Sequence, residues 1–220
     1  MKSGGRYDTS GLVEAQFEPG SNKRVLKNLL GIKRKREMDQ AEGDALRTAT
    51  DRFLHTFDEK HRFTVADLRE MHGVWLGGIY EWAGEYRQVS VSKGGFTFAV
   101  AGVIPGLMTE FEKGPLRRNT PCVFESREKV IEALAEVHVE LLLIHPFREG
   151  NGRLARMLAT IMATQAGLPI LDFTLLKGKI KEKYFAAVRA GMERDYKPMQ
   201  DIFDFIIKKT VRTSERLSAS

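Results

Sequence analysis

The chain has little of what marks a secreted or membrane protein. Cys122 is its single cysteine among 220 residues, so no internal disulfide can form. No apolar run approaches the roughly 18 residues that a membrane-spanning helix needs. The first apolar residues, Leu12 and Val13, stand isolated, unlike the apolar centre of a signal peptide. We therefore expect a cytoplasmic protein with no membrane partner, and delivery into another cell stays open.

Acidic residues are outnumbered, because 35 lysines and arginines against 29 acids give a net charge of +6. Such an excess is compatible with nucleic acid, phosphate ligands or acidic proteins as partners. The one dense basic run, residues 33–36, lacks the interleaved aromatic side chains that stack on single strands. We interpret it as a solvated helix face and expect no nucleic-acid partner.

Strand patterns are scarce, and most of the chain repeats apolar residues at three- and four-residue intervals, as amphipathic helices do. Thr64 with Asp67 three residues on is typical of a helix N-cap. We therefore predict a mainly α protein, whose hydrophobic content of 42% is enough for a core. Helical patterns cover residues 34–57, 64–80, 102–113, 125–144, 151–166, 179–193 and 198–212.

The chain shows no internal repeat and no second-domain boundary. Residues 1–33, rich in glycine, serine and charge, are predicted to be an irregular extension that packs on the core. Residues 34–212 are predicted to form the domain, and residues 213–220 a flexible polar tail.

Residues 86–98 carry the one convincing strand pattern. Val89 and Val91 alternate with polar residues, residues 93–95 (Lys-Gly-Gly) interrupt the run, and Phe96 resumes the alternation. This pattern predicts a short β-hairpin. From the residues alone, a surface hairpin without a functional role remains open.

Two other reactive side chains are expected to be structural. His138 lies on the apolar face of the helix predicted over 125–144, which favours a buried, hydrogen-bonded core histidine. Cys122 has no evident base partner in the sequence, so we expect it to be inert.

The stretch "HPFREGNGRLAR", residues 145–156, joins two predicted helices. Pro146 disfavours helix at His145, so the imidazole is expected to project from a helix end. Phe147 is expected to point into the core and anchor the loop. The simpler alternative is a helix–turn–helix in which Gly150 and Gly152 are ordinary turn residues.

The second half of this stretch has the chemistry of a phosphate site. Gly150, Asn151 and Gly152 tolerate unusual backbone angles that can aim consecutive N–H groups at one anion. The helix that begins near Asn151 adds its free amides and its positive dipole end. Arg153 and Arg156 lie on one face of its first turn, and guanidinium groups match phosphate oxygens.

Glu149 would repel a polyphosphate unless a cation lay between them. A carboxylate together with phosphate oxygens is a typical magnesium environment. A histidine that titrates near neutral pH can accept a proton from an attacking hydroxyl. The loop therefore predicts a magnesium–nucleotide site with His145 beside it.

These residues resemble a known signature. "HPFREGNGRLAR" fills every fixed position of the Fic-domain pattern His-Pro-Phe-x-Asp/Glu-Gly-Asn-Gly-Arg-x-x-Arg. The upstream stretch "IYEWAGEYRQVSVSKGGFTF" is similar to the family's target-binding flap and lies at the expected distance. The resemblance covers roughly residues 10–205 and implies the Fic-fold helical bundle with a short β-hairpin flap.

The resemblance implies a protein adenylyltransferase, which transfers AMP from ATP to a Tyr, Thr or Ser hydroxyl of a target protein. His145 would be the general base and Glu149 would hold Mg²⁺. Glycine at 152, where the kinase-like branch has lysine, favours AMP transfer. The remaining roles follow the motif: an anion hole of Gly150, Asn151 and Gly152, phosphate contacts from Arg153, Arg156 and Lys93, and a target-binding flap of Val89, Val91, Lys93, Gly94, Gly95 and Phe96. An alternative is a nucleotide- or protein-binding module of the same fold with little transferase activity.

The resemblance to Fic proteins also gives expectations about how the protein is inhibited and which proteins it modifies. Fic enzymes are typically inhibited by a helix with the pattern Ser/Thr-x-x-x-Glu-Gly/Asn. Ser10 and Glu14 match only its first half, because Ala15 follows, whereas residues 18–32 resemble the opening of toxins controlled by a separate protein. We therefore expect a small antitoxin as inhibitor, in preference to Glu14. The target is unidentified, and analogy suggests a type II topoisomerase subunit or a small GTPase.

Overall fold

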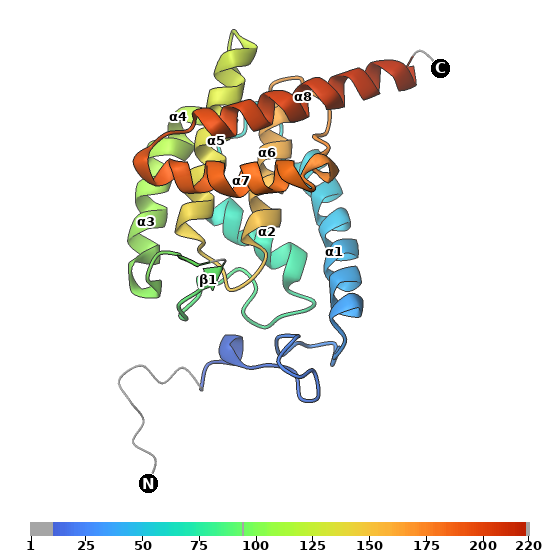
Figure 1. Cartoon of the computed structure of the whole chain (residues 1–220), viewed down its shortest axis with the longest axis vertical. Helices are drawn as coiled ribbons and strands as arrows, with labels where there is room; N and C mark the ends of the chain where they lie inside the picture. The colour runs from blue at the N-terminus through green and yellow to red at the C-terminus, as the bar shows by residue number, and fades with distance from the viewer. Residues whose placement is uncertain (1–10, 94, 219–220) are drawn as a thin grey trace.

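The structure, a computed structural model, describes residues 11–93 and 95–218. Within this part, the chain forms a helical bundle with a two-stranded antiparallel hairpin near the lower end in Figure 1. The mainly α fold class predicted from the sequence is confirmed. Its α-helices are α1 (Lys35–Thr56), α2 (Val65–Leu76), α3 (Ile104–Phe111), α4 (Arg117–Asn119), α5 (Arg127–Ile144), α6 (Asn151–Gln165), α7 (Lys179–Ala190) and α8 (Lys197–Ser218).

Shorter elements complete the described chain. Single 3₁₀ turns lie at Val13–Ala15, Ala101–Val103, Phe173–Leu175 and Gly191–Glu193. A π-helical segment, Glu112–Leu116, contains Pro115 and joins α3 to α4. The helix predicted over 102–113 therefore continues to Asn119, because a π turn accommodates the missing N–H of proline.

Helix α5 is the centre of the bundle. It packs against α6, α8, α3 and α7. In Figure 1 it runs beside α6, behind α7 and α8, which lie side by side across both helices. Its buried side chains lie on every side of the helix, as expected for a helix that is surrounded by others. The C-terminus of α5 and the N-terminus of α6 meet at the loop 145–150, so the rigid core fixes both ends of this loop.

Local signals set several helix ends. At α2, Thr64 accepts a hydrogen bond from the amide of Asp67 while Asp67 accepts one from the amide of Thr64, which is the predicted N-cap. This helix was expected to reach Tyr80 but ends at Leu76. Two consecutive glycines follow, and glycine is a weak helix former.

Helix α8 corrects the predicted end of the domain. It continues through residues 213–218, which were expected to lie in a flexible tail, and the Thr213 hydroxyl bonds back to the carbonyl of Lys209. No glycine or proline interrupts residues 199–218, so nothing in the sequence stops the helix at 212. Residues 219–220 of the predicted tail lie outside the described residues.

The segment from residue 11 to residue 34 is irregular and lies along the base of the bundle (Figure 1). An isolated bridge joins Phe17 to Leu26, and Val25 is buried in the core. The amide of Leu29 donates to the carbonyl of Ile79, which fixes the segment to the turn that follows α2. Residues 1–10 of the predicted extension lie outside the described residues.

The hairpin is shorter than the sequence predicted. Strand β1 is Ser92–Lys93 and β2 is Phe96–Thr97, so Val89 precedes the paired region. The amide of Phe98 still donates to the carbonyl of Val91. Farther from the turn, no backbone pairing joins residues 89 and 99. The side chain of Arg87 bonds to the carbonyls of both residues instead.

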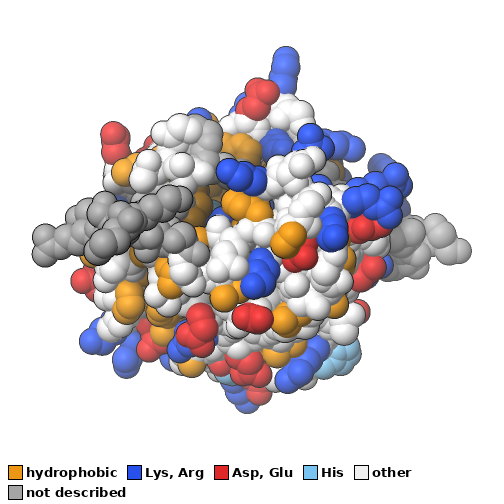
Figure 2. Space-filling model, turned by 90° about the horizontal axis from the view of Figure 1, so that it is seen from below, with side chains coloured by type: hydrophobic (Ala, Val, Ile, Leu, Met, Phe, Trp, Pro, Cys, Tyr) orange, Lys and Arg blue, Asp and Glu red, His pale blue; other side chains and the backbone are white. Residues whose placement is uncertain are grey.

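The basic run 33–36 is an exposed helix start. Arg34 pairs with Glu37, and Lys35 pairs with Asp39 one turn further along α1. On the face drawn in Figure 2, acidic and basic side chains are interspersed. These ion pairs agree with the interpretation of a solvated helix face. In the described residues, every helix is too short or too polar to cross a bilayer.

Candidate active site

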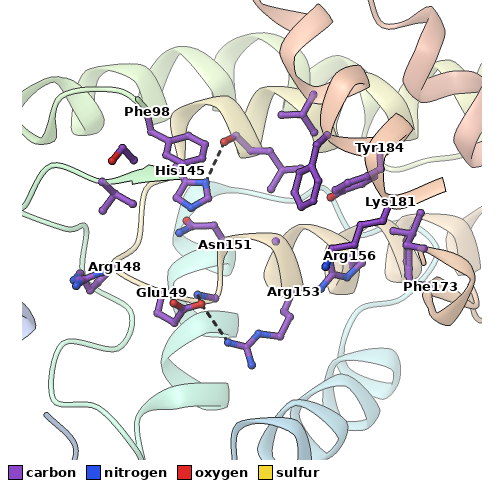
Figure 3. Close-up of a pocket in the computed structure, with 18 residues that line it drawn as sticks. Phe98, His145, Arg148, Glu149, Asn151, Arg153, Arg156, Phe173, Lys181 and Tyr184 are labelled. Atoms are coloured by element: carbon purple, nitrogen blue, oxygen red, sulfur yellow. Dashed lines mark hydrogen bonds and ion pairs between the residues drawn. The ribbon is translucent and has the colours of Figure 1, made fainter. Parts of the chain in front are cut away.

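A cavity of about 610 Å³ opens at the junction of α5 and α6 (Figure 3). The loop and the first turns of α6 form one wall, the hairpin arms lie at one end, and α7 with residues 173–176 closes the other. The structure brings together at this cavity the following residues predicted from the sequence: His145, Glu149, Gly150, Asn151, Gly152, Arg153 and Arg156.

Only some of the residues predicted to form the target-binding flap lie at the cavity. Val91 lines the cavity, whereas Val89 is buried and does not line it. Phe96 lies in β2, where its ring packs edge-on against Phe98. Gly95, at a φ of 77°, forms the hairpin turn. Gly94 and the side chain of Lys93 lie outside what the structure describes, so their roles stay predictions.

His145 is the C-cap of α5 in the left-handed conformation, with φ 53° and ψ 59°. For a residue other than glycine this conformation costs roughly 1–2 kcal/mol, so the surrounding structure must hold it. Its ring Nδ1 lies 3.2 Å from the carbonyl oxygen of Leu142. A neutral ring that donates there carries its lone pair on Nε2. The Phe98 ring stacks on the imidazole at 3.7 Å between centroids and fixes its plane (Figure 3).

Phe147 anchors the loop as predicted. It is fully buried and stacks on His72 of α2, with 4.0 Å between ring centroids. The side chain of Asn151 closes the same loop, because its Oδ1 accepts from the amide of Phe147 and its Nδ2 donates to the carbonyl of Phe147. The Asn151 side chain therefore shapes the loop, and what this residue offers an anion is its backbone amide.

His72 supports the loop from below. Its Nδ1 accepts from the amide of Gly84 at 2.8 Å, and its Nε2 lies 3.1 Å from the carbonyl of Glu149. The ring is thus neutral, with the proton on Nε2. Burial lowers the pKa of His72 from 6.5 to about 4, and burial likewise lowers the pKa of His138 to about 3.

We expect the protein to lose stability as the pH falls below about 6.5. In that range the unfolded chain protonates both histidines while the folded chain keeps them neutral, so protons favour unfolding. Each histidine should lower the free energy of unfolding by up to about 1.4 kcal/mol per pH unit until its folded-state pKa is reached. Urea denaturation at pH 7, 6 and 5 measures this, and equal midpoints would contradict it.

The start of α6 forms the phosphate side of the cavity. Of the three residues expected to have unusual backbone angles, only Gly150 does, at φ 84°; Asn151 and Gly152 are already the first helical residues. The amides of Arg153 and Leu154 donate to the carbonyl of Gly150. The expected loop of three residues with unusual backbone angles is therefore replaced by one left-handed glycine followed by a helix N-terminus. A helix N-terminus is itself an anion-binding site.

Glu149 suits a magnesium ion held mainly by phosphate. It is the one carboxylate among the described residues that line the cavity, and its side chain is 48% exposed. Among the described residues, no cluster of three or more His, Cys, Asp or Glu side chains could hold a metal alone. Mg²⁺ commonly uses one or two carboxylates, with phosphate oxygens and water as the other ligands. The residues present therefore fit magnesium that arrives with a nucleotide.

Arg153 is held by protein partners. Its Nη1 lies 2.7 Å from Oε2 of the buried Glu42 on α1, and its Nη2 lies 3.4 Å from Oε1 of Glu149. Its guanidinium also lies over the Trp75 ring, 4.8 Å from the centroid. The other oxygen of Glu42 accepts from the Tyr80 hydroxyl at 2.6 Å. Arg153 thus fixes the position of Glu149 as well as lining the cavity.

Arg156 lies one turn further along α6, against Tyr184 of α7 (Figure 3). Burial raises the pKa of Tyr184 to about 12, and the adjacent Arg156 opposes this rise. The Tyr184 hydroxyl lies 2.8 Å from Nε2 of His138, whose Nδ1 lies 3.1 Å from the carbonyl of Ala155. His138 is therefore the buried, hydrogen-bonded core histidine that the sequence predicted.

Several cavity residues were not found from the sequence. Arg148 is the motif position to which no role was assigned, and the others come from elements outside the motif: Ser92, Phe98, Leu142, Phe173, Leu176, Lys181, Tyr184, Phe185 and Val188. Most are apolar and come from the α7 side, which gives the cavity an apolar end opposite the charged loop. Periodicity marks such residues only as members of a helix face, so no local signal distinguished them. Cys122, which was expected to be inert, is buried, and burial raises the pKa of its thiol to about 12.

The family model described as Fic/DOC family matches residues 62–163, which include the flap and the whole loop. The chain is 28% identical over 192 residues to the probable protein adenylyltransferase Fic of Escherichia coli K12, covering 84% of this chain and 88% of that protein. It is 30% identical over 151 residues to the protein adenylyltransferase Fic of Culex quinquefasciatus, covering 68% of this chain but only 28% of that longer protein.

A solved structure agrees with these sequence matches. The BepC protein of Bartonella tribocorum, a VirB-translocated effector solved with bound AMPPNP, superposes with a TM-score of 0.72 at 25% identity. The match covers 89% of this chain and 97% of BepC. The helical bundle and hairpin described above are thus the Fic fold, as predicted from the motif. The chain therefore contains a Fic domain, which the family model places at residues 62–163.

Proposed function

We propose that the protein is an adenylyltransferase that transfers AMP from ATP to a hydroxyl of a target protein. The observation that carries this proposal is the position of His145, held by Leu142 and Phe98 at one cavity with the N-terminus of α6 and Glu149. The names of the relatives from Escherichia coli and Culex quinquefasciatus support the same activity.

Nucleotide binding would use both ends of the cavity. The triphosphate would lie against the α6 N-terminus and Arg156, while the apolar end near Phe173 and Leu176 suits a purine base. Because Arg153 already has two carboxylate partners, we assign the main phosphate contact to Arg156. Mg²⁺ held by Glu149 would neutralise phosphate oxygens that otherwise repel the carboxylate. The AMPPNP reported with BepC supports a nucleotide at this site.

The reaction would be a displacement at the α-phosphorus. The hydroxyl oxygen of the target forms the new P–O bond, its proton passes to Nε2 of His145, and the bond from the α-phosphorus to the bridging oxygen breaks. Pyrophosphate leaves with that oxygen. Backbone amides and Arg156 stabilise the charge on the phosphate oxygens, so positioning and electrostatics supply most of the catalysis. An extended segment of the target would pair with the hairpin as an added strand and carry the hydroxyl to His145.

We also propose that inhibition comes from a second protein. The candidate internal inhibitor, Glu14, has another structural role here. Its Oε1 accepts from the amide of Gln88 at 2.6 Å, and its carbonyl accepts from Nε of Arg148 at 2.8 Å. A glutamate that acts on Arg156 would then be supplied by a separate small protein with the pattern Ser/Thr-x-x-x-Glu-Gly/Asn.

Incubation of the protein with lysate and labelled ATP tests the reaction. Label transferred to protein from the α-phosphate supports AMP transfer, whereas label only from the γ-phosphate supports kinase chemistry. ATP binding without any transferred label would favour the alternative of a binding module. Mass spectrometry of the labelled band identifies the target and the modified residue.

A further inference from the structure

Arg87 lies at the base of the hairpin and is 1% exposed. Its guanidinium donates to a carbonyl on each arm. Nη1 lies 2.7 Å from the oxygen of Val89, before β1, and Nη2 lies 2.6 Å from the oxygen of Ala99, after β2. The two arms are therefore joined at their base by this one side chain.

The same guanidinium also bonds to the catalytic loop. Its Nε lies 2.7 Å from the carbonyl oxygen of His145, and Nη2 lies 3.5 Å from that of Ile144. The backbone amide of Arg87 adds a bond of 2.9 Å to the carbonyl of Pro146. Two of these carbonyls lie at the C-terminal end of α5, where the helix dipole is negative and favours a buried cation.

We infer that Arg87 is a positioning residue that holds the hairpin at a fixed place relative to His145, so that a hydroxyl carried by a docked strand reaches Nε2. This role rests on the proposed function, because it assumes that the hairpin binds the target. The bond to the His145 carbonyl also supports the left-handed backbone of that residue. Lysine cannot replace it, since an ammonium group lacks the planar fork that reaches carbonyls in several directions.

Arg87→Lys separates this role from general support of the fold. We expect faster hydrogen–deuterium exchange in peptides covering 88–99, and a loss between about tenfold and 10²-fold in the initial rate of label transfer from α-labelled ATP to protein in lysate. The Kd for ATP should stay within about twofold, because no phosphate contact is removed. The matched control is Arg69→Lys. Arg69 donates to the carbonyl of Gly84 and to the carboxylate of Glu85, so it supports the neighbouring stretch of chain without touching the hairpin.

Each outcome decides the inference. Unchanged exchange over 88–99 in Arg87→Lys would overturn it, and so would an equal increase in Arg69→Lys. If the wild-type protein transfers no AMP, the proposed function fails, but the exchange comparison still decides whether Arg87 holds the hairpin. If Arg87→Lys does not fold, Arg87→Gln replaces a buried cation with a neutral planar amide. Failure of both to fold would assign Arg87 to the stability of the whole domain and overturn a role specific to the hairpin.

Discussion

Replacement of His145 by asparagine or alanine should lower the rate of AMP transfer by roughly 10²–10⁴-fold. Both changes remove the ring whose Nδ1 lies against the Leu142 carbonyl and whose Nε2 is assigned the proton of the attacking hydroxyl. Asparagine is the sharper test, because it tolerates the left-handed backbone observed at this position. The measurement is the initial rate of α-phosphate label transfer at saturating ATP.

ATP binding and thermal stability provide the controls for this prediction. The Kd for ATP should change little, because His145 is assigned no phosphate contact. His55→Ala, at an exposed histidine near the end of α1, should transfer AMP at the wild-type rate. Transfer by His145→Asn within about threefold of wild type would place the base elsewhere, since loss of a general base normally costs far more.

Gly150→Ala should destabilise the protein by about 2–5 kcal/mol. The left-handed backbone at φ 84° accounts for about 1–2 kcal/mol and overpacking for about 1–3 kcal/mol. A Cβ here would lie 2.7 Å from Cζ3 of Trp75 and 3.3 Å from Cδ1 of Leu76. Trp75 has little room to move, because it is buried and its Nε1 donates to the carbonyl of Glu42 at 2.9 Å.

A second glycine separates the two contributions. Gly167 has a similar φ of 73°, but a Cβ there would meet no atom within 4 Å. Gly167→Ala should therefore cost only the backbone part, about 1–2 kcal/mol. Urea denaturation of both variants gives the comparison. Equal losses would mean that the Trp75 contact relaxes without cost, and the steric account of Gly150 would then be wrong.

The helices themselves were largely predictable, because apolar periodicity and capping residues are local. The capped start of α2 and the ends of α1, α5 and α6 were predicted within two residues. The hairpin was less predictable. Alternation of Val89 and Val91 suggested a longer strand, but the Val89 carbonyl bonds to the Arg87 side chain and pairing begins only at Ser92.

The candidate site likewise has a part that could be predicted from the sequence and a part that could not. The contiguous motif carries His145, Glu149 and Arg156, and the proposed magnesium–nucleotide site follows from their residue types and spacing. The partners that hold them could not. Glu42 lies 111 residues before its ion-pair partner Arg153, and Arg87 lies 58 residues before His145. Periodicity shows that a residue faces inward, but not which residue of another helix it meets.

Local signals in the sequence predicted the helical class and the loop between α5 and α6, and they are the basis for proposing nucleotide binding at that loop. These depend on interactions between near neighbours, where backbone preference and charge act over a few residues. Three contacts became visible only in the folded protein: Glu42 with Arg153, Tyr184 with Arg156, and Arg87 with both the hairpin and His145. Such contacts depend on how helices cross and which side chains are buried together, and packing settles this only when the whole core has formed.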